Sequence, residues 1–249
     1  MLRTFAGGSL FGSVTGPDAP RVLALHGWAR THRDFDAVVA PVGGEPLSAL
    51  ALDLPGFGAS PPPPAAWGAA GYAQAVAEVL SEMQSPVVVL GHSFGGRVAL
   101  HLATQRPASV EALVLTGVPH LLPEGPGRVR VPPAYKAIRS LHRMRIVSDD
   151  AMERARQRYG SSDYKAAQGI MRQVLVRSVN ETYEQQLAGV QCPVHMIWGA
   201  ADTAAPLEMA ERALARLAHG DLEVFPDVGH LTPLLIPDAL RASVVSCLH

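Results

Sequence analysis

A serine stands between two glycines in the stretch Gly-His-Ser-Phe-Gly at residues 91–95. Before it, residues 86–90 form an apolar run rich in β-branched side chains, which is typical of a buried strand. After it, residues 97–106 have the pattern of a helix that ends before Pro107. A tight strand-to-helix turn needs small neighbours and exposes the hydroxyl of its central serine. The sequence therefore predicts that Ser93 is a nucleophile.

Two later loops supply the partners that such a serine needs. A serine hydroxyl is a weak nucleophile at neutral pH unless a base lies beside it and a carboxylate orients that base. Asp202 follows the strand-like run at residues 193–198, and His230 follows the run at residues 222–225. Because the carboxyl ends of parallel strands open on one edge of a sheet, we expect Ser93, His230 and Asp202 to converge there.

Other ionisable residues compete for these roles. Asp227 lies only three residues before His230, and we interpret it as a turn residue. Asp53 is interpreted as a carboxylate that orders its own loop. His26 and His92 adjoin functional backbone, and we expect them mainly to orient loops.

A tetrahedral intermediate on Ser93 also needs hydrogen-bond donors for its oxyanion. Phe94, the residue after the nucleophile, can offer its backbone N–H. The loop that follows the strand-like run at residues 21–25 can offer the N–H of Trp28, whose ring can line an acyl pocket. We predict that the substrate pocket contains His26, Trp28, His120 and Leu231.

The elements that must position these residues alternate along the chain. Strand-like runs separated by helical patterns predict an α/β fold, with a mostly parallel sheet covered by helices on both faces. Strand-like runs vanish in residues 118–190, a stretch too long for an unstructured connection. We therefore expect a core formed by residues 1–117 and 192–249, with a helical cap formed by residues 118–191.

Composition narrows the class of protein. The 249 residues are 48% hydrophobic and 17% charged, which suits a globular domain, and the net charge of -1 gives no case for nucleic-acid binding. No run of about 18 apolar residues predicts a membrane span, and the N-terminal residues lack the apolar segment of a signal peptide. Two cysteines suggest no disulfide framework, so we predict a cytoplasmic location.

Charge is unevenly distributed between the two parts. Residues 118–190 contain twelve Lys or Arg and seven Asp or Glu, a net charge of +5, while the rest of the chain has −6. A basic lid can steer an anionic substrate towards the site. The alternative is a set of solvated helix faces whose arginines are partly paired with nearby acids.

Five motifs in this order resemble the α/β-hydrolase superfamily, in particular its small members with a helical cap. They are Leu-His-Gly-Trp at 25–28, Asp-Leu-Pro-Gly-Phe-Gly-Ala-Ser at 53–60, Gly-His-Ser-Phe-Gly-Gly at 91–96, Trp-Gly-Ala-Ala-Asp at 198–202 and Gly-His at 229–230. The resemblance covers residues 20–117 and 192–249. It implies an eight-stranded sheet, a triad of Ser93, Asp202 and His230, and no required metal or organic cofactor.

The resemblance also narrows the chemistry. In some members the acid follows the strand before the cap, but residues 117–120 read Gly-Val-Pro-His, which leaves Asp202. Epoxide hydrolases and haloalkane dehalogenases of this superfamily use aspartate at the position of Ser93. The His-Gly-Gly-Gly loop of hormone-sensitive-lipase-like esterases is absent. The single His-Gly-Trp is similar to small carboxylesterases, including those that cleave pimeloyl-type methyl esters.

These observations predict a serine hydrolase that cleaves a small-molecule carboxylic ester through an acyl-enzyme on Ser93. Two alternatives on the same triad stay open, a C–C bond hydrolase and an acyltransferase. A third alternative is a non-catalytic ligand-binding protein with this fold, which would be expected to have a degraded triad.

Overall fold

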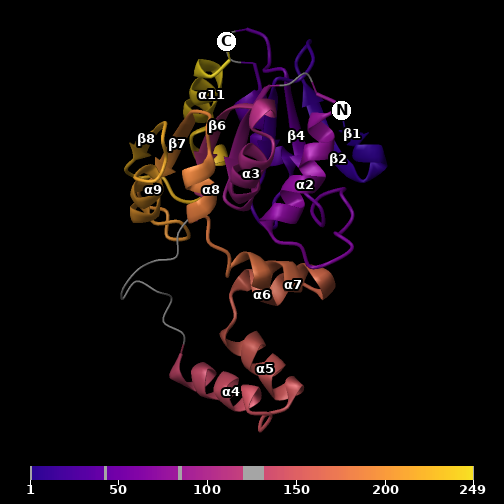
Figure 1. Ribbon diagram of the computed structural model, residues 1–249, viewed down its shortest axis with the longest axis vertical. Coiled ribbons are helices and arrows are strands. Elements are labelled where there is room, and N and C mark those ends of the chain that lie inside the picture. Colours follow the sequence, from indigo (N-terminus) through magenta and orange to yellow (C-terminus); the bar gives the residue numbers. More distant parts are fainter. Residues whose placement is uncertain (1, 42–43, 84–85, 120–131, 249) are drawn as a thin grey trace.

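An eight-stranded sheet forms the centre of the molecule in the computed structural model, which describes residues 2–41, 44–83, 86–119 and 132–248 (Figure 1). The strands lie in the order β1-β2-β4-β3-β5-β6-β7-β8. Their bounds are β1 Leu2–Phe5, β2 Leu10–Thr15, β3 Val22–Leu25, β4 Ala49–Asp53, β5 Val87–His92, β6 Val110–Thr116, β7 Val194–Gly199 and β8 Gly220–Phe225.

The sheet is mostly parallel, as the sequence predicts. Strand β2 runs antiparallel to both of its neighbours, and every pair from β4 to β8 is parallel. Leu25 pairs with Gly91, and His92 pairs with Thr116. The carboxyl ends of β3, β5 and β6 therefore lie together at one edge. The predicted α/β fold with an eight-stranded, mostly parallel sheet is confirmed.

Helices cover both faces of the sheet because side chains alternate along each strand. Leu23 and Leu25 of β3 pack into one buried cluster with α2 and α3, while Val22 and Ala24 pack into another with α1 and α11. The helical segments outside the β6–β7 connection are η1 Ala6–Gly8, η2 His32–Phe35, α1 Asp36–Val39, α2 Ala69–Leu80, α3 Phe94–Gln105, η3 Pro107–Ser109, α9 Leu207–Leu214 and, after β8, α10 Thr232–Leu235 and α11 Pro237–Ser246.

The described residues between β6 and β7 form five helices: α4 Pro133–Arg143, α5 Asp149–Tyr159, α6 Ser162–Ala166, α7 Gly169–Ser178 and α8 Glu184–Gly189. Figure 1 shows α8 beside α3, α6 and α7 just beyond the sheet, and the α4–α5 pair farther out. The described part of the predicted cap is thus helical. The division at residues 118 and 191 stays a prediction.

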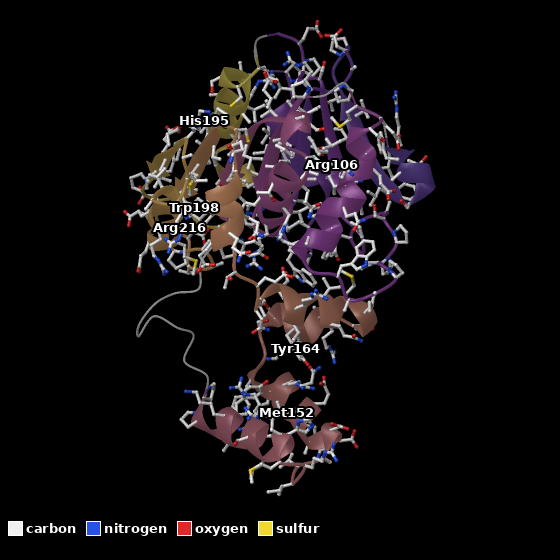
Figure 2. The ribbon with its side chains drawn as sticks, in the orientation of Figure 1. Arg106, Met152, Tyr164, His195, Trp198 and Arg216 are labelled. Atoms are coloured by element: carbon white, nitrogen blue, oxygen red, sulfur yellow. The ribbon has the colours of Figure 1, made fainter. Side chains whose placement is uncertain are left out.

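Local chemistry explains where α5 and α6 begin. Ser148 accepts a hydrogen bond from the N–H of Ala151, and Ser161 accepts one from the N–H of Tyr164, so each helix starts behind a serine cap. Glu153 of α5 then binds Arg172 of α7 at 2.5 Å and the Tyr164 hydroxyl at 3.2 Å. Figure 2 labels Tyr164, a residue of α6, between the α6–α7 helices and the outer pair. Polar contacts therefore join the outer pair to the inner one.

Across the described residues, every helix is too short or too polar to cross a lipid bilayer.

Candidate active site

Ser93 occupies a strained turn between β5 and α3. Its φ of 50° and ψ of −113° put a residue with a side chain in a region that favours glycine. Gly95 permits the turn, because a Cβ there would collide with the backbone carbonyls of Leu25 and His26 at the end of β3. The start of α3 is therefore pressed against the loop that follows β3.

A continuous hydrogen-bond chain connects the three residues that the sequence singles out. The Nε2 of His230 lies 3.0 Å from the Oγ of Ser93, and its Nδ1 lies 2.7 Å from the Oδ2 of Asp202. The Asp202 side chain is fully buried, whereas that of His230 is 28% exposed. This is the geometry in which an imidazole can take a proton from a serine while a carboxylate holds the ring.

The loop around Asp202 is held firmly. Its Oδ1 accepts hydrogen bonds of 2.8 Å from the N–H groups of Ala204 and Ala205. The indole of Trp198, labelled in Figure 2 on β7, donates to the carbonyl of Ala205 at 2.8 Å. The carboxylate is thereby fixed with Oδ2 free to face His230.

The competing acids lie elsewhere. Asp227 is exposed, and the only hydrogen-bonded carboxylate on His230 among the described residues is that of Asp202. Gly117, in the alternative position after β6, sits beside the pair, since a Cβ there would lie 3.3 Å from Asp202 Oδ2. The space beside Gly117 that a carboxylate side chain would need is therefore occupied by the side chains of Asp202 and His230.

Asp53 structures two loops. Its Oδ1 accepts from the backbone N–H and the Nδ1 of His32, both at 2.8 Å, and its Oδ2 accepts from the N–H of Ala59 at 2.9 Å. Burial alone would raise the pKa of this carboxyl, but these hydrogen bonds outweigh it and lower the pKa of Asp53 below its ordinary value. The role agrees with its interpretation as a loop-ordering residue.

His92 and His26 are buried imidazoles that join backbone segments. His92 donates from Nε2 to the carbonyl of His230 at 2.8 Å, and burial together with the nearby His230 lowers its pKa to about 4. His26 donates from Nδ1 to the carbonyl of Gly27 and accepts from the N–H of Leu54 at 3.0 Å. Burial lowers the pKa of His26 to about 4 as well. Both rings are therefore neutral at pH 7.

The two candidate oxyanion donors adjoin each other. Phe94 is the first residue of α3, so its N–H has no acceptor within the helix. The rings of Trp28 and Phe94 meet edge to face with centroids 5.6 Å apart. A Cβ at Gly27 would lie 3.2 Å from the Cβ of Ser93, so the Trp28 loop passes directly beside the serine.

A cavity of about 310 Å³ opens over Ser93 and His230. Of the predicted pocket residues, Trp28 and Leu231 line it. His26 is not among the residues that line this cavity; it is fully buried, and both ring nitrogens bond to backbone, which fits the loop-orienting role that the sequence also suggests. His120 lies outside the described residues.

Several lining residues were missed in the sequence. Arg97 lies one helical turn after Ser93, a spacing that could have identified it. Ser178 and Val179 come from the end of α7, and only the tertiary structure brings them over the serine. Among the described residues, no group of three His, Cys, Asp or Glu side chains is placed to hold a metal ion.

Comparison with known proteins gives a consistent result. A family model described as "Alpha/beta hydrolase family" matches residues 22–242. The chain is 30% identical, over 246 residues, to the pimeloyl-[acyl-carrier protein] methyl ester esterase of Aromatoleum aromaticum, covering 88% of this chain and 94% of that protein. The protein of that name from Chromobacterium violaceum is 29% identical over 243 residues, with coverages of 89% and 91%.

Among solved structures, the esterase from Exiguobacterium antarcticum superposes with a TM-score of 0.73. The comparison covers 99% of this chain and 98% of that one at 20% identity. At that identity the likeness concerns the fold alone.

Proposed function

This chain belongs to the alpha/beta hydrolase family, and from that premise we propose that it is a serine carboxylesterase that works through an acyl-enzyme on Ser93. The observation that carries the proposal is the hydrogen-bond chain from Asp202 through His230 to Ser93 at the base of a cavity. The relatives named as esterases support ester hydrolysis as the reaction.

In the first half of the reaction, the Oγ of Ser93 attacks the carbonyl carbon of the ester while its proton passes to the Nε2 of His230. Asp202 stabilises the imidazolium that forms. The N–H groups of Phe94 and Trp28 bind the negative oxygen of the tetrahedral intermediate. When the intermediate collapses, the C–O bond to the alcohol breaks, and His230 returns the proton to the leaving oxygen.

In the second half, a water molecule attacks the acyl-enzyme. His230 takes a proton from this water, and a second tetrahedral intermediate forms at the same oxyanion donors. Its collapse breaks the bond to Ser93, returns the proton to Oγ and releases the carboxylic acid. The 28% exposure of the His230 side chain gives water access to the ring.

The relatives' names suggest the substrate class to test first. Two of them are named for the methyl ester of a pimeloyl group attached to acyl-carrier protein. We infer that methyl esters of short and medium acyl chains are the first candidates. The cavity walls formed by Trp28, Phe94 and Leu175 are apolar, which suits such a chain.

A fluorophosphonate probe tests the proposal directly. We expect a mass shift on Ser93, turnover across a panel of chromogenic esters, and loss of both in Ser93→Ala. Ser81→Ala, on the exposed end of α2, is the matched control and should behave like the parent protein. A fully active Ser93→Ala protein would exclude the proposal, and turnover of a ring-fission product without esters would favour a C–C bond hydrolase.

A further inference from the structure

Arg97 brings a positive charge to the wall of the cavity that contains Ser93. It lies on α3 four residues after the serine, which places its Cα about 6 Å farther along the helix axis on the same face. Such a position is within reach of a group attached to the substrate, but not of the scissile bond itself. The proton transfers described above make no use of it.

The hydrogen bonding of the Arg97 guanidinium is incomplete. Its Nη1 donates to the carbonyl of Ser178 at 2.8 Å, which fixes the side chain against the end of α7. Its Nε is buried and has no partner among the described residues. Buried donors are nearly always satisfied, so an unpartnered one on a residue that lines the cavity calls for an explanation.

No carboxylate of the described residues forms an ion pair with Arg97. Tyr183 lies under it, with the guanidinium carbon 5.7 Å from the ring centroid. The Tyr183 hydroxyl donates to Glu181 at 2.8 Å, but Glu181 also accepts from the N–H of Ala69 and lies 3.8 Å from Arg177. The carboxylate of Glu181 is therefore shared among other partners.

The other charged residues of the cavity wall do not offer a comparable positive charge without an acidic partner. Arg30 also lines the wall, but it forms a bidentate pair with Asp34 at 2.6 and 2.7 Å, so its charge is already matched. Asp163 of α6 is exposed and lies at the boundary with a neighbouring cavity. Arg97 is thus the cation of this wall that lacks a directly bonded acid within the described chain.

We propose that Arg97 is an anion-recognition residue that binds a carboxylate or phosphate carried by the ester substrate a few bonds from its scissile carbonyl. A planar guanidinium suits both oxyanions, and partial burial strengthens the interaction. The inference rests on the proposed esterase function of Ser93. It specifies an ester that carries a negative charge as the substrate class and Arg97 as the residue that binds this charge. This contact would act in addition to any long-range attraction by the basic residues of segment 118–190.

Two matched pairs of esters test this and distinguish which side of the ester bears the anion. Monomethyl adipate against dimethyl adipate places the charge on the acyl side. 2-Acetoxyethyl phosphate against 2-acetoxyethanol places it on the alcohol side. We expect the parent protein to prefer the anionic member of one pair in kcat/KM by tenfold or more. No preference in either pair would overturn the proposal.

Variants then assign the preference to one residue. In Arg97→Gln the ratio of anionic to neutral kcat/KM should fall by about ten- to a hundredfold, the value of a charge-assisted hydrogen bond in a partly buried site. Arg97→Lys should keep part of the preference, which also covers the case in which Arg97→Gln fails to fold. Arg30→Gln removes a paired charge from the same wall and should keep the ratio. An unchanged ratio in Arg97→Gln, or an equal loss in Arg30→Gln, contradicts the proposal.

Binding separates this inference from the esterase proposal. In Ser93→Ala protein, calorimetric titration with adipate should give a Kd that weakens at least tenfold when Arg97→Gln is added. If no ester is hydrolysed but this Arg97-dependent binding is found, the esterase proposal fails and the anion site stands. If esters are hydrolysed without charge preference and adipate does not bind, the anion site fails alone.

Discussion

The edge of the sheet and the helices between β6 and β7 are built in different ways. At the sheet edge, buried polar groups connect several loops: His92 bonds to the carbonyl of His230, and Asp53 joins two further loops. In α4, by contrast, no residue is buried, and Met144 and Ile146 beyond its end are 66% and 65% exposed. The residues proposed for proton transfer are thus rigidly held, while the outer helices pack loosely.

This difference suggests a division of labour. Catalysis depends on geometry accurate to a fraction of an ångström, so its residues belong on the rigid part of the fold. Selection among substrates tolerates, and often uses, elements that move. The end of α7 is intermediate, since Val174 is fully buried while Val179 at the cavity mouth is 54% exposed. Substitutions in the two regions should therefore affect different quantities.

The largest effect is expected at the base. His230→Ala removes the proton acceptor of Ser93, and kcat should fall by about 10⁶-fold, with little change in KM. Steady-state kinetics on a chromogenic ester measures this. A fall of less than tenfold would show that another group takes the proton, and the comparison between the two regions would lose its basis.

The next effect is expected at the acid. Asp202→Asn keeps the shape of the side chain but disfavours the required tautomer of His230, so kcat should fall by about 10⁴-fold. Asp227→Asn, at an exposed position three residues before His230 in the chain, is the matched control and should stay near the parent value. If the two results were reversed, Asp227 would be the acid.

Stability of the rigid region should depend on pH through its buried histidines. The folded-state pKa of His92 is about 4, below its ordinary value of 6.5, so the unfolded chain binds more protons between these pH values. The contribution of the neutral His92 ring to the free energy of unfolding is complete above pH 6.5. It is lost as the pH falls towards 4, up to a limit of about 3 kcal/mol.

Denaturant unfolding at several pH values measures this loss. His92→Gln should remove about half of the dependence of the unfolding free energy between pH 6.5 and 4, because His26 has a similarly lowered pKa and keeps its share, whereas His219→Gln, at an exposed position, should leave the dependence unchanged. A parent profile that is flat in this range would mean that His92 is accessible to protons, and that the sheet edge is less rigid than its contacts indicate.

The smallest effect is expected in the outer helices. Glu153→Gln weakens the contacts with Arg172 and Arg156, all partly exposed, so the unfolding free energy should change by less than about 1 kcal/mol. We expect Glu153→Gln to change the relative rates of hydrolysis across the panel of esters more than it changes the free energy of unfolding. A loss of several kcal/mol would show that these helices belong to the cooperative core.

Much of the fold could be predicted because its signals are local. The runs of β3, β5 and β7 are short and mostly apolar, β5 is rich in β-branched residues, and Ser93 lies in a turn that only small neighbours allow. The positions of Asp202 and His230 followed from one rule, that parallel strands open on a common edge. The sequence suggested two roles for His26, orienting loops and lining the pocket, and it could not choose between them because the backbone partner of its Nε2, the N–H of Leu54, is 28 residues away in the chain.

The sequence by itself determined the order of the elements and the three residue types that meet at the sheet edge. Periodicity and turn chemistry act between near neighbours, so they are visible in the chain. Only the tertiary structure decided that Ser178, at the end of α7, binds the guanidinium of Arg97 and leaves its Nε unpartnered beside the cavity. That contact joins residues 81 positions apart, and its formation depends on how α7 packs, which no local pattern specifies.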